Sequence, residues 1–315
     1  MALLNNKIGI IIKAIGGIYF VEAPDGVFEC SARGIFRKKE ISPCCGDRVR
    51  IETENNENYV ISEIFDRKNY LIRPPLANLD QMIFVVSTCS PVPNFLLLDK
   101  FIAICEYKHI KPIIAITKID MKGISDITDI YSSAGITVYS VNNITGEGCE
   151  KVLAQLTGNL SAFTGNSGVG KSTMLNNILP ELKLDTNEIS KKLGRGKHTT
   201  RHVELYKLDK GGYVADTPGF STLDTQRYDI ILKEDLASCF TEFEDYTGKC
   251  RFQDCSHTKE KGCAVIDAVN NGLIKKAYFF LILWQVLQQG RVWLHFLQAR
   301  NQTPHQLKSS IQMRR

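Results

Sequence analysis

The first part of the chain, up to about residue 73, consists of short apolar-rich runs of strand length. Turn residues lie between them, for example Gly16-Gly17 and Pro24-Asp25-Gly26. The runs that we expect to form strands are Lys7 to Ala14, Ile18 to Ala23, Val27 to Ala32, Arg48 to Glu52 and Tyr59 to Phe65. Short strands at this spacing, separated by such turns, are typical of a small β-barrel. We therefore expect residues 1–73 to form a five-stranded barrel.

After residue 73 the pattern changes to buried apolar runs that alternate with segments of helical periodicity. The expected strands are Gln81 to Thr88, Ile113 to Thr117, Thr137 to Val141 and Ser161 to Thr164. The expected helices are Phe95 to Tyr107 and Lys171 to Leu179. This alternation predicts an α/β domain with a largely parallel sheet. Because Arg73-Pro74-Pro75 has the composition of a linker, we place this domain at residues 74–235.

Two further elements are predicted toward the C-terminus, a hairpin and a helical domain. Two strands around His202 to Ala215 flank Asp209-Lys210-Gly211-Gly212, a hairpin signature. Residues 236–315 are expected to form a helical domain that contains a cluster of cysteines. The sequence therefore predicts a multidomain α/β protein with an N-terminal barrel and a C-terminal helical domain.

Composition excludes several protein classes, and the charge has an uneven distribution. With 43% hydrophobic and 23% charged residues, the 315-residue chain is neither a disordered tail, a collagen nor a multi-span membrane protein. The net charge of +5 comes from residues 275–315, which hold seven basic residues and no acids. The remainder has 32 basic and 34 acidic residues. RNA binding would therefore depend on local patches, such as Arg33 to Lys39 and Lys191 to Arg201, and a plain solvated surface is the alternative for the barrel.

A phosphate-binding loop follows the expected strand at Ser161 to Thr164. It matches the full P-loop pattern, in which glycines let backbone amides converge on phosphates at a helix N-terminus. Lys171 is expected to contact the β- and γ-phosphates, and the Ser172 hydroxyl to bind magnesium. The residues that we expect at the nucleotide phosphates are Gly165, Asn166, Ser167, Gly168, Val169, Gly170, Lys171, Ser172 and Thr173.

A second motif, Thr117-Lys118-Ile119-Asp120, lies at the end of the strand expected at Ile113 to Thr117. It is similar to the guanine-reading motif of GTPases. Asp120 would accept two N–H groups from guanine, whereas adenine would leave this carboxylate unpaired. This disfavours the rival hypothesis of a P-loop kinase or ATPase. Thr117 replaces the usual asparagine, so one hydrogen bond is weaker or remade. Ser140-Val141-Asn142, at the end of the next strand, either contributes a backbone amide to the base or is a plain loop.

A third motif begins 44 residues after Ser172, where Asp216-Thr217-Pro218-Gly219 follows an apolar strand. An acid at this position holds magnesium in P-loop NTPases, and the Gly219 amide can sense a γ-phosphate. The basic segment from Gly194 to Arg201 is the expected first switch, where Thr199 or Thr200 would complete the magnesium shell. The guanine motif precedes the phosphate loop, which is the order of a circularly permuted P-loop GTPase domain.

The cysteines predict a zinc site. Cys250, Cys255, His257 and Cys263 lie within 14 residues, and three thiolates with one imidazole suit tetrahedral zinc. Cys239, just upstream, is the rival ligand. We expect the other cysteines to be small buried hydrophobes. The chain opens without a secretory leader, so we expect a cytoplasmic protein with reduced thiols.

Together, and in this order, the motifs resemble those of the RsgA (YjeQ/YloQ) family of bacterial small-ribosomal-subunit biogenesis GTPases. The resemblance runs from about residue 7 to about residue 275 and includes Gly46-Asp47-Arg48-Val49 in the barrel. It implies an OB-type barrel that binds rRNA, a permuted GTPase domain and a C-terminal domain with one zinc ion. It also implies GTP hydrolysis, with magnesium, stimulated by the small ribosomal subunit during late maturation. We expect a monomer without membrane attachment; the alternative function is an RNA-binding assembly factor that binds GTP without hydrolysing it.

Two positions depart from what GTPases usually have. Phe220 stands where many GTPases place a glutamine that orients the attacking water, so we expect slow intrinsic hydrolysis. His198 is the candidate to replace that glutamine, and a histidine facing phosphate or RNA is the alternative. The apolar run from Ala277 to Leu287 also differs from the family, which usually has a charged helix there. A buried helix, an interfacial helix, a non-homologous tail and a frame-altered tail all remain open.

Overall fold

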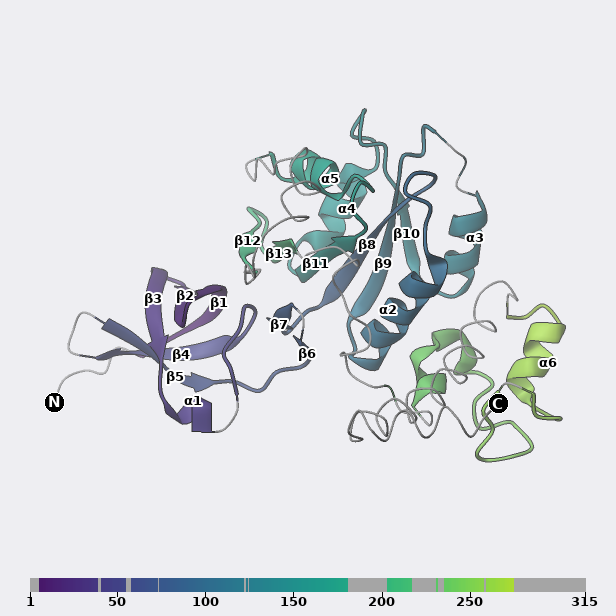
Figure 1. Cartoon of the computed structure of the whole chain (residues 1–315), viewed down its shortest axis with the longest axis horizontal. Coiled ribbons are helices and arrows are strands. Elements are labelled where there is room, and N and C mark those ends of the chain that lie inside the picture. Colours follow the sequence, from purple (N-terminus) through teal and green to yellow (C-terminus); the bar gives the residue numbers. More distant parts are fainter. Residues whose placement is uncertain are drawn as a thin grey trace, which may run out of the picture. The chain divides into compact units, whose positions relative to one another are not determined.

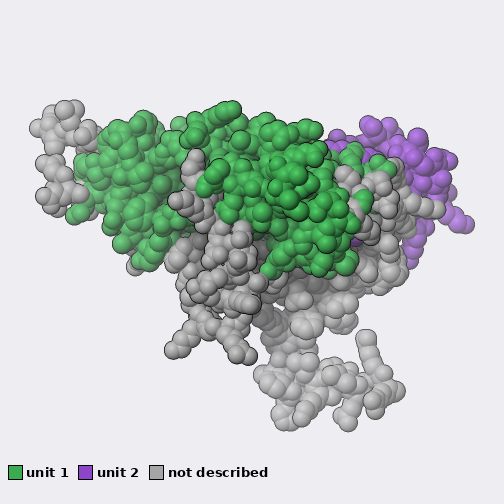
Figure 2. Space-filling model, turned by 90° about the horizontal axis from the view of Figure 1, so that it is seen from above, with its two compact units in different colours: residues 1–94, 105–132, 136–230 green, residues 95–104, 133–135, 231–315 purple. Residues whose placement is uncertain are grey.

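The computed structural model describes residues 6–38, 41–54, 58–72, 74–121, 123, 125–180, 203–216, 231, 235–257 and 259–274 (Figure 1). The chain divides into two compact units, which Figure 2 shows in different colours. The first contains residues 1–94, 105–132 and 136–230, and the second contains residues 95–104, 133–135 and 231–315. The barrel and the strands of the expected nucleotide domain both belong to the first unit.

The N-terminal strands form a closed five-stranded barrel, as the sequence predicts. Its strands are β1 (Lys7–Ile15), β2 (Ile18–Ala23), β3 (Gly26–Ala32), β4 (Arg48–Glu54) and β5 (Asn58–Ile64). They are hydrogen-bonded in the order β1-β2-β3-β5-β4, and the short helix α1 (Ile35–Lys38) lies between β3 and β4. The side chains of Ile11, Val21, Val49, Ile51 and Ile61 are fully buried inside it. Because buried positions alternate with outward positions along these strands, the pattern of apolar residues in the sequence predicts them.

The basic side chains of the barrel are largely matched by acids. Arg33 pairs with Glu52 at 2.6 Å, and Arg50 pairs with Glu63 at 2.9 Å. Lys7 likewise pairs with Asp25. The side chains of Arg37 and Lys38 and all of Lys39 lie outside the described residues. The described part of the predicted Arg33 to Lys39 patch is therefore an ion pair and not an unmatched charge.

The Gly46-Asp47 dipeptide ties the barrel to the segment that follows it. Asp47 is fully buried, and Arg67 donates to its carboxylate from Nε at 2.6 Å and from Nη2 at 2.7 Å. The Cys44 amide donates to the same carboxylate at 2.8 Å. Gly46 has φ +87, and a Cβ there would overlap the Ala77 carbonyl oxygen. Only glycine fits this turn, and the buried carboxylate is compensated on both oxygens.

A small hairpin lies where the sequence suggests a linker. Strands β6 (Tyr70–Ile72) and β7 (Pro75–Ala77) pair antiparallel, with Ile72 opposite Pro75. Leu76 and Ala77 are fully buried, and the Ala77 amide donates to the Cys45 carbonyl at 2.9 Å. Proline is tolerated at the first position of a strand, as Pro75 is here. The two prolines therefore shape a turn between packed strands and do not mark a free linker.

The second part of the first unit is a six-stranded sheet of mainly parallel strands. Its strands are β8 (Gln81–Ser87), β9 (Lys111–Thr117), β10 (Thr137–Ser140), β11 (Leu160–Gly165), β12 (Leu205–Lys207) and β13 (Tyr213–Asp216). They lie in the order β10-β9-β8-β11-β13-β12, and only β12 is antiparallel to its neighbour. Strands β12 and β13 form the predicted hairpin. This confirms the α/β class.

Helices follow the strands in the described part of the chain. The sequence predicted α2 (Phe95–Tyr107) and α5 (Lys171–Ile178) but not α3 (Ser125–Ser133) and α4 (Cys149–Leu156). Val152 and Leu156 of α4 and Met174 and Leu175 of α5 share one core cluster with sheet residues such as Phe163. This packing fixes α5, and thus the end of the phosphate loop, against the sheet (Figure 1).

The described part of the second unit is short. Besides residues 95–104 of α2, it contains the 3-10 helices η3 (Leu236–Cys239) and η4 (Thr241–Phe243) and the helix α6 (Ala264–Asn270). The run from Ala277 to Leu287 and the rest of the tail lie outside the described residues. Across the described part of the chain, no helix is long and apolar enough to cross a membrane.

Candidate active site and metal centre

The strand ends bring the predicted nucleotide motifs to one edge of the sheet. Strand register pairs Ser87 with Thr117, and Val85 with Gly165. It also pairs Phe163 with Asp216. Because these strands are parallel, the guanine motif, the phosphate loop and the Asp216 motif all leave the sheet at its carboxyl edge. Along the chain the guanine motif comes before the phosphate loop, which is the motif order of a circularly permuted GTPase domain.

The phosphate loop connects β11 to α5, the strand-to-helix context that its pattern requires. Gly168 and Gly170 have φ values of +81 and +93, which residues with a side chain rarely adopt. A Cβ on Gly165 would lie 2.5 Å from the Val85 carbonyl oxygen on the adjacent strand. Helix α5 begins at Lys171, so its first amides and its dipole face the loop. The glycines are therefore required by the geometry of the loop.

Thr117 contacts the phosphate loop. Its side chain is fully buried, and Oγ1 donates a hydrogen bond of 2.5 Å to the Val169 carbonyl oxygen. Threonine at this position, where asparagine is usual, therefore forms a hydrogen bond to the phosphate loop. Thr117 links the guanine motif to the phosphate loop.

The rest of the guanine motif is held by the loop after β8. Lys118 has φ +58, its carbonyl accepts from Thr88 Oγ1 at 2.7 Å, and its ammonium donates to the Ser90 carbonyl. Asp120 is exposed at the end of the turn. The backbone of the motif is therefore fixed while the carboxylate stays accessible to a ligand.

Asn143 is a residue at this site that sequence reasoning missed. It lies in the loop between β10 and α4, and its amide nitrogen donates to the Gly170 carbonyl at 2.9 Å. Its only sequence signal was its place just after a strand whose carboxyl end reaches the same edge. The loop after β10 thus touches the phosphate loop.

The structure does not describe the predicted switch residues. His198, Thr199, Thr200 and Gly219 lie outside the described residues, and of Asp216 only the backbone is described. The predicted patch from Lys191 to Arg201 lies outside them as well.

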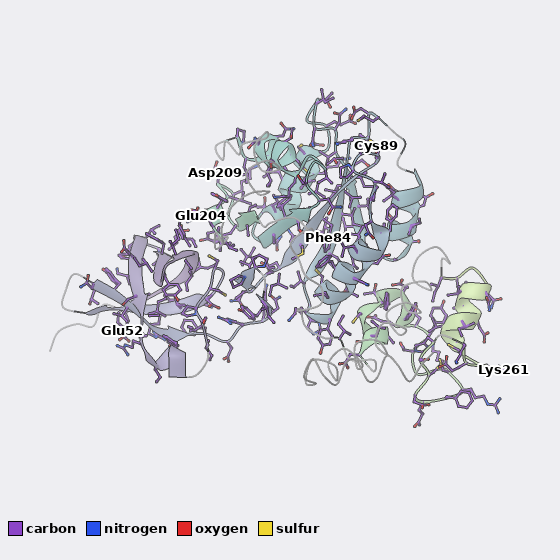
Figure 3. All side chains as sticks on the ribbon, viewed as in Figure 1. Glu52, Phe84, Cys89, Glu204, Asp209 and Lys261 are labelled. Carbon is purple, nitrogen blue, oxygen red and sulfur yellow. The ribbon has the colours of Figure 1, made fainter. Side chains whose placement is uncertain are left out.

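Strand β12, which follows the predicted first switch, contacts the barrel. Glu204, just before β12 (Figure 3), forms an ion pair at 2.9 Å with Lys13 of β1, and the two residues share an isolated β-bridge. The Cys45 thiol donates to the Val203 carbonyl at 3.1 Å. Tyr213 donates to Glu22 at 3.1 Å, and burial together with this carboxylate raises the pKa of Tyr213 to about 12. The strand that leaves the switch is thereby attached to β1.

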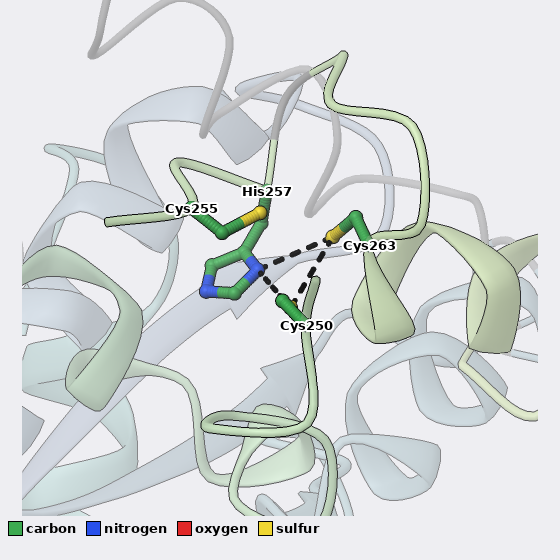
Figure 4. A group of neighbouring side chains, drawn as sticks. All are labelled: Cys250, Cys255, His257 and Cys263. Atoms are coloured by element: carbon green, nitrogen blue, oxygen red, sulfur yellow. Dashed lines mark hydrogen bonds between the residues drawn. The ribbon is translucent and has the colours of Figure 1, made fainter. Parts of the chain in front are cut away.

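The four predicted metal ligands converge in the second unit (Figure 4). Their ligand atoms all lie within 4.8 Å of one another. Cys250 Sγ is 3.8 Å from Cys263 Sγ, and His257 Nδ1 is 3.5 Å and 3.3 Å from these two sulfurs. Two thiolates bound to tetrahedral zinc at about 2.3 Å are about 3.8 Å apart. The donor set and its spacing therefore fit a tetrahedral metal ion.

The electrostatics of this cluster favour a bound cation. Burial raises the pKa of the Cys263 thiol to about 12 and also raises the pKa of Cys255. Burial lowers the pKa of His257, which keeps its imidazole neutral and able to ligate. Packed thiols become thiolates only when a cation compensates their charge. A neutral imidazole and packed thiols that a cation can convert to thiolates are therefore suited to a structural metal site.

Cys239 does not join the cluster. Its thiol donates to the Asp235 carbonyl at 3.4 Å, and it lies outside the group of four that the described residues form. The cysteines that we expect to be buried hydrophobes are buried in nearly every case. They are Cys30, Cys44, Cys45, Cys105, Cys149 and Cys239, whereas Cys89 is partly exposed.

Comparisons with known proteins agree with this geometry. A family profile described as "RsgA GTPase" matches residues 64–226, and "RsgA N-terminal domain" matches residues 8–61. The chain is 42% identical over 278 residues to "Small ribosomal subunit biogenesis GTPase RsgA" of Caldanaerobacter subterraneus subsp. tengcongensis, covering 87% of this chain and 93% of that one. It is 44% identical over 290 residues to the protein of the same name from Clostridium novyi, covering 90% and 98%.

Two solved structures share the fold. The crystal structure of YjeQ from Thermotoga maritima has a TM-score of 0.75 and 34% identity, and the match covers 90% of this chain and 99% of that chain. The structure of YloQ, described as a circularly permuted GTPase, has a TM-score of 0.71 and 32% identity, with 96% and 99% covered. The similarity thus extends over nearly the whole of both neighbours.

Proposed function

Because the chain belongs to the RsgA family of GTPases, which hydrolyse GTP, we propose that it acts on the small ribosomal subunit. In this proposal it binds the subunit during late maturation, hydrolyses GTP there and is then released. The relatives' shared name, which refers to biogenesis of this subunit, supports the partner. The observation that carries the GTPase activity is the meeting of the guanine motif, the phosphate loop and the Asp216 strand at one sheet edge.

The proposed division of labour follows the three motifs. Asp120 reads guanine, with Lys118 over the base plane, while Thr117 holds the phosphate loop. The amides of the loop and the Lys171 ammonium compensate the charge of the phosphates. A magnesium ion supplied with GTP would lower the charge on the phosphates, held by Ser172, by Asp216 through water and by Thr199 or Thr200. The Gly219 amide would sense the γ-phosphate.

The proposed domains are the OB barrel at residues 1–73, the GTPase domain at 74–235 and the zinc-binding domain at 236–315. Cys250, Cys255, His257 and Cys263 would hold one zinc ion per chain. The ion pair of Lys13 with Glu204 offers a route from the first switch to the barrel. A GTP-dependent change in the switch would then alter how the barrel meets rRNA. Work on ribosomal subunits implies a cytoplasmic protein.

The association is tested by pelleting the protein with purified small subunits. We expect it to pellet with them in a non-hydrolysable GTP analogue and to remain mostly in the supernatant in GDP. Large subunits are the matched control and should not pellet it in either state. Equal pelleting with both subunits, or none with small subunits in the GTP analogue, would contradict the proposed partner.

His198 is proposed to orient the attacking water in place of the glutamine that Phe220 replaces. Changing His198→Ala should lower subunit-stimulated turnover by about 100-fold, the usual contribution of a general base or water-positioning group. GTP affinity should stay unchanged. His202→Ala, just after this switch segment, is the control and should keep full stimulated turnover. Stimulated turnover that survives in His198→Ala would show that the histidine has another role, such as contact with phosphate or RNA.

A further inference from the structure

The loop between β10 and α4 is held in shape by its own hydrogen bonds. Asn142 Oδ1 accepts from the amides of Ile144 at 2.9 Å and Thr145 at 3.3 Å. The Asn142 amide donates to the Glu147 carbonyl at 2.9 Å, and the Gly146 amide donates to the Asn142 carbonyl at 2.8 Å. All of these hydrogen bonds lie within the loop, so its conformation does not depend on a bound nucleotide. The loop can therefore position a neighbouring segment that contacts it.

Asn143, the next residue, connects this loop to the phosphate loop and to α5 at two points. Its Nδ2 donates to the Gly170 carbonyl oxygen at 2.9 Å. Its own carbonyl accepts from Asn177 Nδ2 at 3.0 Å, two turns further along α5. Gly170 precedes the helix without a side-chain cap and has φ +93. The Asn143 amide does not act as a cap, because it donates to the Gly170 carbonyl and accepts from no helix amide among the described residues, but it holds that peptide from outside the helix.

The Gly170 carbonyl is held from two sides. Besides Asn143, it accepts from the Met174 amide at 2.9 Å, which is the first hydrogen bond of α5. In a trans peptide the C=O and the following N–H point in opposite directions. Fixing the Gly170 oxygen therefore fixes the direction of the Lys171 N–H. In the same way, Thr117 fixes the Val169 oxygen and hence the Gly170 N–H.

From this geometry we propose that Asn143 is a positioning residue for the phosphate site. It keeps the Lys171 amide directed toward the bound phosphates, so that the loop is preorganised before GTP or GDP binds. Thr117 at the end of β9 and Asn143 in the loop after β10 thus orient two consecutive peptide groups of the phosphate loop. These are the peptides that follow Val169 and Gly170. The inference depends on nucleotide binding alone and is independent of the proposed ribosomal partner.

The two atoms of the Asn143 amide make the test selective. Oδ1 is buried and lacks a hydrogen-bond partner among the described residues. Asn143→Ala therefore removes the donor to Gly170 without breaking another bond of the side chain. Asn143→Asp keeps the size and replaces the donor by a carboxylate, which regains an O–H donor when it is protonated. Asn142→Asp is the matched control, because Asn142 Oδ1 acts only as an acceptor in the contacts above.

The measurement is the Kd of a fluorescent GDP analogue for each purified full-length variant. At pH 8 we expect about a tenfold weaker Kd for Asn143→Ala, as for the loss of one positioned hydrogen bond. A larger loss is expected for Asn143→Asp, which adds negative charge beside the phosphates. Asn142→Asp should bind within twofold of the wild type. The preference for GDP over xanthosine diphosphate should be unchanged in all three, because the base contacts are untouched.

The pH profile separates positioning from a general loss of structure. Because this position is buried and lies beside the phosphates, the pKa of the introduced carboxyl should be raised above its ordinary value of about 4. Between pH 8 and pH 5 the affinity of Asn143→Asp should therefore recover partly toward that of Asn142→Asp, as the carboxyl gains a proton to donate to Gly170. Asn143→Ala should show no such recovery. Binding within twofold of wild type by both Asn143 variants would overturn the proposal. A loss in Asn143→Asp that is the same at both pH values, or shared by Asn142→Asp, would overturn it as well.

Discussion

Replacing Asp120 by asparagine is expected to change the nucleotide preference from guanine to xanthine. In the proposed site the carboxylate accepts two N–H groups of guanine, and an amide in its place would leave one of these N–H groups facing another donor. Sites built to pair a polar group reject a mismatched ligand by about 10⁴-fold. We therefore expect GDP affinity to fall by about that factor, while xanthosine diphosphate binds better than GDP. The measurement is competition of both nucleotides against a fluorescent analogue.

The control for this change is Asp209→Asn. Asp209 is an exposed aspartate in the turn between β12 and β13 (Figure 3), and its change should leave the preference for GDP intact. ATP should compete poorly with every variant. An Asp120→Asn protein that still prefers GDP would remove Asp120 from the guanine site.

The second large effect is expected from loss of the metal. Cys250→Ser should abolish zinc binding and unfold the residues around the cluster, because structural zinc contributes about 10–16 kcal/mol to the folding of small zinc domains. Rapid proteolysis after residue 235 should follow, while GDP binding by the phosphate loop remains. Metal analysis of the purified protein and limited proteolysis measure both effects. A strong chelator should reproduce them in the wild type.

Cys239→Ala distinguishes the two possible ligand sets. The Cys239 thiol donates to the Asp235 carbonyl and lies outside the group of four, so this variant should retain one zinc ion per chain. Zinc content that disappears in Cys239→Ala, or that persists in Cys250→Ser, would contradict the assignment of Cys250, Cys255, His257 and Cys263.

Strands and helices with a clear period were predictable from the sequence. The helix at Phe95–Tyr107 has the predicted bounds, and each barrel strand agrees within a few residues. The phosphate loop and the metal ligands were predictable because their chemistry requires neighbours in sequence. In such segments the residues that determine the local structure are close together in the sequence, so the pattern alone is enough to predict it.

The features that the sequence did not reveal depend on register and on packing between distant segments. Arg50 is opposite Glu63 in the β4–β5 register, so a residue that seems to supply basic surface is paired with an acid. The contact of Asn143 with Gly170 joins loops whose strands, β10 and β11, are separated in the sheet by β9 and β8. The prolines of the β6–β7 hairpin looked like a linker because the burial of Leu76 is set by tertiary packing.

GTP turnover in the presence and absence of small ribosomal subunits is the decisive quantity for the proposed function. Phe220 cannot orient a water molecule, so the protein alone should turn over slowly, and small subunits should raise the rate at least about tenfold. Large subunits should not raise it, and Lys171→Ala should remove turnover in every condition. A rate that small subunits leave unchanged, with the protein still binding GTP, would contradict subunit-stimulated hydrolysis.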